Sequence, residues 1–135
     1  MINHTAARDG LAQLLTQGLP GVTVQRGGID AVATFPGVIV GQPAWTKVDN
    51  LPYRLDRSTW PIAVVVARNS QDSVVIDELE QLWPAALDLL RTTSEQDQTL
   101  GGICDEAIVT RADFGQFAIQ GTNYPAQLIF IELYG

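Results

Sequence analysis

The clearest pattern in the chain is an apolar stripe that repeats at the spacing of an α-helix. The stripe is formed by Val75, Leu79, Leu82, Ala86 and Leu90. Residues 69–72 precede it and are of types that cap helix N-termini. Pro84 falls on the opposite side, where it would bend the helix without disturbing its packing. The pattern predicts a long amphipathic helix from about residue 72 to Arg91.

A second, weaker helical pattern covers residues 3–17. Its apolar positions are Ala6, Ala7, Leu11, Leu14 and Leu15. Gly10 weakens the pattern, and residues 18–21 form a Gly- and Pro-containing stop signal. We therefore expect a first helix that ends near Gly18.

Several strands are expected between the two helices. Residues 22–26 alternate between apolar and polar, and further strands are expected around 38–40 and 45–48. The run 62–67 is apolar at every position, which is typical of a strand covered on both faces. That run is the best candidate for the centre of the sheet.

After the long helix, a polar loop is expected at 94–102 and strand segments at 107–110 and 116–120. The closing run 128–133 is apolar on both alternating faces except at Glu132. Either this strand lies centrally or a partner covers its second side. Because runs of strands separate the helices, the sequence favours an α+β fold with a mixed, mostly antiparallel sheet.

Composition indicates a single domain spanning residues 1–135. Apolar residues make up 46 % of the chain and charged residues 17 %, enough for a core without a disulfide or metal staple. No run of 18 apolar residues occurs, and the N-terminal residues lack the pattern of a signal peptide. We therefore expect the protein to begin its life in a cytoplasm.

The charge balance argues against a protein that clamps nucleic acid. Eight Lys and Arg residues face fifteen Asp and Glu residues, for a net charge of −7, and Lys47 is the only lysine. Nucleic-acid affinity comes largely from clustered basic side chains. An acidic surface that DNA slides past without binding remains compatible with this composition.

Residues for catalysis are sparse. His4 is the only histidine and lies at an end expected to fray, while Cys104 is the only cysteine and is expected to be buried. Neither glycine pair matches a phosphate-binding motif. An enzyme would require Asp56, Asp105 or Asp113 to converge in a pocket with a raised pKa. We expect no enzyme activity, no cofactor and no metal site.

Aromatic and arginine residues gather in a stretch rich in Pro and Gly between residues 41 and 60. Such side chains are favoured anchors of protein interfaces. The candidate interface residues are Trp45, Tyr53, Arg54, Arg57 and Trp60. The alternative for Trp60 is that it enters the core at the start of its strand.

Over nearly its full length the chain resembles the tail-terminator, or tail-completion, proteins of long-tailed phages. The resemblance rests on the helix ending at 18–21 with the strand 22–24, the run 60–66 leading into the long helix, and the closing strand 124–133. It implies a sheet packed by two main helices on one face. It also implies a hexameric ring that caps the tail tube, stops its growth and receives the filled head.

The partners implied are other copies of the chain, the tail-tube protein and a head-completion or neck protein, in a virion assembled in the host cytoplasm. DNA would pass through the lumen without specific binding. Six copies would carry a charge of about −42, which would repel DNA if it lined the channel. The alternatives are a head-closure or neck ring protein and a non-viral interaction domain.

Overall fold

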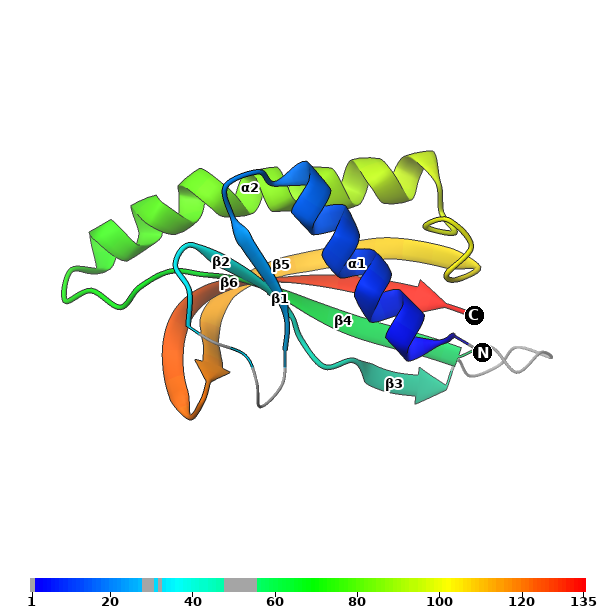
Figure 1. Cartoon of the computed structure of the whole chain (residues 1–135), viewed down its shortest axis with the longest axis horizontal. Helices are drawn as coiled ribbons and strands as arrows, with labels where there is room; N and C mark the ends of the chain where they lie inside the picture. The colour runs from blue at the N-terminus through cyan, green and yellow to red at the C-terminus, as the bar shows by residue number, and fades with distance from the viewer. Residues whose placement is uncertain (1, 28–30, 32, 48–55) are drawn as a thin grey trace.

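The computed structural model describes residues 2–27, 31, 33–47 and 56–135. Within this part of the chain, two helices and six strands follow one another. They are α1 (His4–Gly18), β1 (Thr23–Arg26), β2 (Gly37–Val40), β3 (Ala44–Lys47), β4 (Asp56–Val65), α2 (Asp72–Gln96), β5 (Glu106–Ile119) and β6 (Thr122–Tyr134). The predicted α+β class is confirmed (Figure 1).

The strands form a single mixed sheet in the order β1-β2-β4-β6-β5. β1 and β2 are parallel, and the other described pairs are antiparallel. β4 pairs with β6 on one side and with both β2 and β3 on the other, at opposite halves of its length. The apolar run from residue 62 therefore does lie at the centre of the sheet, as its pattern predicts.

Both helices pack on one face of the sheet. Figure 1 shows α2 running lengthwise along the strands while α1 crosses them obliquely. The core between the helices and the sheet is one cluster of buried side chains. Among them are Leu11 and Leu15 of α1, Leu79 and Leu90 of α2, Ile62 and Val64 of β4, and Ile129, Ile131 and Leu133 of β6.

The start of α1 is anchored, so the expectation of a frayed end is wrong. Asn3 caps the helix, because its Oδ1 accepts the Ala6 N–H at 3.1 Å. His4 is half-buried, with its Nε2 3.1 Å from the Ser58 hydroxyl and its ring edge-on to Trp60. These contacts with β4 hold the first turn of the helix against the sheet.

The glycine in the middle of α1 has a packing role. A Cβ placed on Gly10 would meet the side chain of Ile103, and one placed on Gly18 would meet Leu89 of α2. The two glycines lower helix propensity. They also allow α1 to approach the second helix and the loop that follows it.

α2 begins where the sequence predicts and ends later. Its N-cap residue is Gln71, without a side-chain capping bond. It continues to Gln96, so residues 94–96 of the predicted loop are helical. Ser94 is buried there. Its hydroxyl group has a hydrogen-bond partner within the helix, because it donates to the Arg91 carbonyl at 3.1 Å. Neither described helix is long and apolar enough to cross a membrane.

The two strand segments predicted after α2 are one strand. β5 pairs with β6 along its whole length, with a bulge between Val109 and Arg111. The charged residues in the middle of β5 do not interrupt it, because only one of its faces packs against the core. The continuous hairpin with β6 sets its length.

The two tryptophans give a direct test of this fold. Trp60 is fully buried (0 % exposed), whereas Trp45 on β3 is 59 % exposed. We expect Trp60→Ala to lower the free energy of unfolding by about 3–5 kcal/mol, because it opens a large cavity. Trp45→Ala should change it by about 0.5 kcal/mol or less in the monomer. Urea unfolding of both variants measures the difference, and equal losses would contradict the placement.

Candidate interaction surface

The structure separates the five residues that the sequence nominates for an interface. Trp45 lies exposed on the edge strand β3, and Arg57 is half-buried on β4. Trp60 lies in the core, so the alternative interpretation, that it enters the core with its strand, is the one that holds. Tyr53 and Arg54 lie outside the described residues. Within the described part, the candidates do not form one aromatic loop.

Trp60 is covered from the helix side. The Arg8 guanidinium of α1 lies 5.6 Å from its ring centre, within cation–π range, and His4 contacts it edge-on. Its indole Nε1 is buried without a hydrogen-bond partner among the described residues. Its burial follows from the register of β4, because Trp60 pairs with Ile131 on the face that the helices cover.

The face of the sheet opposite the helices forms a more extensive candidate surface. We call it the open face. It is built by Arg57, Thr59 and Pro61 of β4, Ile108, Arg111 and Asp113 of β5, and Leu128, Phe130, Glu132 and Tyr134 of β6. The β4 and β6 members are half-buried and the β5 members are exposed. No described helix packs on this surface.

At the middle of the open face, Phe130 and Arg111 form a stacked pair. The Arg111 guanidinium lies 4.4 Å from the Phe130 ring centre, and its Nε is 3.2 Å from a carboxylate oxygen of Asp113. Both charged side chains are more than half exposed, so the ion pair contributes little to stability. The arrangement presents an aromatic ring and a guanidinium together, a combination common in protein interfaces.

At one end of the open face, Tyr134, Glu132 and Arg57 lie together. The Tyr134 hydroxyl donates to Glu132 Oε2 at 2.7 Å, and Arg57 pairs across the strands with Tyr134. The hydrogen bond to Glu132, helped by partial burial, raises the pKa of Tyr134. Arg57 Nε is buried without a partner among the described residues. Polar side chains therefore border the apolar centre.

Towards the tip of the β5–β6 hairpin, the same side of the sheet is covered. A second small core joins buried residues of β2, β4 and the hairpin, namely Ile39, Ala63, Val65, Ile119 and Ala126, with Ala31. The Phe35 and Tyr124 rings lie 5.0 Å apart above it. The open face is thus the part of this side beyond the second core, and Leu128 lies at the border, packed against that core.

The sequence carries a signal for the open face but does not locate it. The closing strand is apolar on both sides, which left a central position and a partner-covered side as alternatives. The structure shows the first alternative, because β6 lies between β4 and β5, and its side chains Leu128 and Phe130 remain half-exposed. Only the position of the helices shows which of its two faces stays uncovered.

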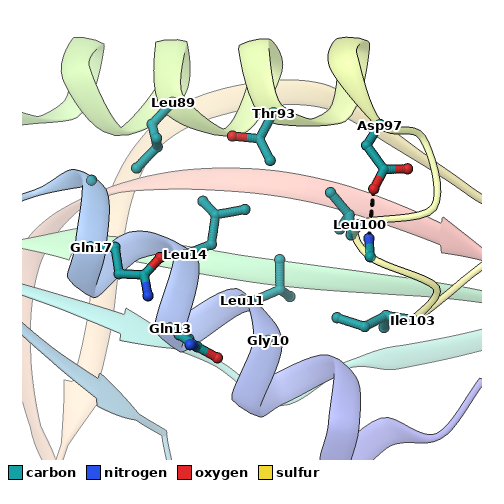
Figure 2. A pocket seen from close by; sticks show the side chains of 12 residues that line it. Gly10, Leu11, Gln13, Leu14, Gln17, Leu89, Thr93, Asp97, Leu100 and Ile103 are labelled. Carbon is teal, nitrogen blue, oxygen red and sulfur yellow. Dashed lines mark hydrogen bonds between the residues drawn. The ribbon is translucent and has the colours of Figure 1, made fainter.

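A groove of about 500 Å³ lies between α1, the end of α2 and the following loop (Figure 2). Leucine and glutamine side chains line much of it, and Asp97 is its ionisable residue. Asp97 accepts hydrogen bonds from the Thr99 hydroxyl (2.6 Å) and from the Gly101 N–H (2.8 Å), which lower its pKa. The carboxylate therefore holds the loop in place.

The three aspartates that an enzyme would need are distributed along the sheet. Asp56 and Asp105 lie at the end of the sheet near the C-terminus, whereas Asp113 lies farther along β5 on the open face. Among the described residues, no group of three His, Cys, Asp or Glu could hold a metal ion. The chain matches no protein-family model and no curated protein.

Cys104 gives a prediction for the loop next to the groove. It is buried, with its Sγ 3.6 Å and 3.7 Å from the carbonyl oxygens of Gln98 and Thr99. Burial, with the charges of Asp105 and Asp97, raises its pKa from 9.0 to about 11. The folded state therefore favours the neutral thiol over the thiolate. The contribution of this preference to the free energy of unfolding is complete below the ordinary thiol pKa, and it is lost as the pH rises towards about 11.

We therefore expect iodoacetamide to alkylate native Cys104 slowly at pH 8, with a rate that rises until about pH 11. The same chain unfolded in urea should react much faster at pH 8 and level off near the ordinary thiol pKa. Mass spectrometry of timed samples measures both profiles. A native profile that coincides with the unfolded one would contradict the burial of this thiol.

Proposed function

We propose that this chain is the subunit of a homo-oligomeric ring, of the hexameric type implied by its resemblance, that ends a phage tail tube and joins it to the head. The observation that carries the proposal is the open face. It leaves Leu128 and Phe130 of an internal strand without cover from the described helices. A neighbouring protein can bury these side chains.

The fold supports the proposal at a coarser level. The tail-terminator resemblance implies a sheet with helices on one side, and both helices of this chain pack on a single face. Exposed apolar side chains also lie on both edge strands, Trp45 on β3 and Ile108 and Phe114 on β5. A protein that works as one part of an assembly needs such surfaces on more than one side.

The acidic composition is compatible with a passage for DNA. A net charge of −7 per copy disfavours tight binding of a polyanion. The same properties would suit a head-closure or neck ring. Contact with the tail tube separates the two functions, because only a terminator stops tube growth.

Assembly is the first test. A chain of 14.6 kDa in a six-membered ring gives a particle of about 88 kDa. We expect this mass by light scattering for the protein alone, and a larger mass when the tail-tube protein is added. Added during tube polymerisation, the protein should shorten the tubes seen by electron microscopy. A strictly monomeric protein that leaves tube length unchanged would refute the proposal.

Phe130 tests the role of the open face. Phe130→Asp places a carboxylate in its apolar centre without touching the helix-side core, and should abolish tube shortening while circular dichroism stays unchanged. Phe114→Asp is the matched control, because Phe114 is 62 % exposed on the same hairpin but faces the helix side. Equal loss in both variants would show that the open face has no special role.

A further inference from the structure

The sheet has a free edge on each side within the described part of the chain. At one side, β5 pairs only with β6. At the other, β2 and β3 lie end to end along β4, and β1 extends the sheet beyond β2 alone. No described strand lies beyond β3. The backbone groups on the outer side of β3 and of β5 are therefore available for pairing with another strand.

The two free edges have compatible directions. β3 is antiparallel to β4, β4 to β6, and β6 to β5, so β3 and β5 run in opposite directions. In a ring, each copy is related to the next by the same rotation about the ring axis, so one edge of each copy meets the opposite edge of its neighbour. When the β5 edge of one copy lies beside the β3 edge of the next, the two strands are therefore antiparallel.

The register places complementary residues at the same level. Thr46 pairs with Arg57, Arg57 with Tyr134, and Tyr134 with Glu106, so β3 lies level with the beginning of β5. Lys47, one residue farther, is level with Asp105. Lys47 has no ion pair with any residue that the structure describes, whereas Asp105 and Glu106 are exposed acids. When the β3 edge of one copy meets the β5 edge of another at this level, Lys47 therefore lies opposite Asp105.

The apolar groups match as well. Trp45 pairs with Ser58, so its exposed ring lies on the helix side of β3, in the row that ends at Ala107. Beside Ala107, a hollow of about 200 Å³ lies between β5 and the end of α2. Ala107 and Val109 of β5 line it on one side, and Arg91, Ser94 and Glu95 of α2 line it on the other. The hollow offers a large side chain a small apolar floor and a guanidinium, 3.9 Å from Glu95, for a cation–π contact.

The geometry points to a head-to-tail contact between copies, in which β3 of one copy adds to the β5 edge of the next. In this contact Trp45 fills the hollow beside α2, and Lys47 meets Asp105, the acid that is level with it. The inference rests on the proposed ring and specifies how it closes. It makes the sheet continuous from copy to copy and leaves the open face available for a different partner.

Charge reversal tests the contact. Lys47→Glu should weaken ring formation by at least about tenfold, measured as the concentration at which rings dissociate in analytical ultracentrifugation. Asp105→Lys in the same chain should restore it. Arg68→Glu is the matched control, because Arg68 is an exposed arginine beside residues 114–116, far along β5 from Asp105, and it should leave assembly unchanged. Absence of rescue, with equal weakening by Arg68→Glu, would overturn the inference.

A covalent test is independent of affinity. In a Cys104→Ser background, Thr46→Cys with Glu106→Cys places one thiol on each edge, level with the other. Within one copy two strands separate them, so their distance is about 14 Å and a disulfide can form only between copies. Oxidation should produce a ladder of covalent oligomers. Thr46→Cys with Phe114→Cys, which are not level, should produce none.

The outcomes separate the inference from the proposed function. If the unmodified chain forms rings or caps tubes while the Thr46 and Glu106 cysteines never cross-link, the edge contact is wrong and the function stands. If the unmodified chain neither assembles nor caps tubes, the proposed function fails. A ladder that stops at a fixed number of copies supports both and counts the subunits.

Discussion

The structure depends on packing both helices against the same face of β4 and β6. This face carries Trp60, Ile62 and Val64 of β4 and Ile129, Ile131 and Leu133 of β6, all buried beneath α1 and α2. Complete burial of one such side chain contributes about 1.5–3 kcal/mol. Because the helices cover this face only, the opposite face of the sheet must be covered by other segments of the chain or remain exposed.

The second face is covered in two ways. Near the hairpin tip, the chain closes it with a small core that includes Ile119 and Ala126. Farther along, it leaves the open face, where Phe130 stacks on Arg111 and Tyr134 bonds to Glu132. The Arg111 guanidinium covers part of the Phe130 ring, which lowers the free-energy cost of leaving this ring half-exposed. A surface of this kind can accept a neighbouring protein.

The two proposals assign different parts of the molecule to assembly. The open face is a broad surface of mixed apolar and polar groups, whereas the edges offer backbone hydrogen bonds with Trp45, Lys47 and the acids at the start of β5. The short strand β3 is central to this division, because it extends the sheet past the end of β2 and presents an edge that no described strand covers.

Local pattern determined the elements of this protein. Helical periodicity located α2, and continuous apolarity identified β4 as the centre and β6 as apolar on both sides. Tertiary structure decided what those patterns leave open. Register placed Trp60 in the core and Trp45 outside it, docking onto Ser58 and Trp60 anchored His4, and pairing with β6 joined two predicted segments into β5. Periodicity reports which residues share a face, but only packing between distant segments determines which face is covered.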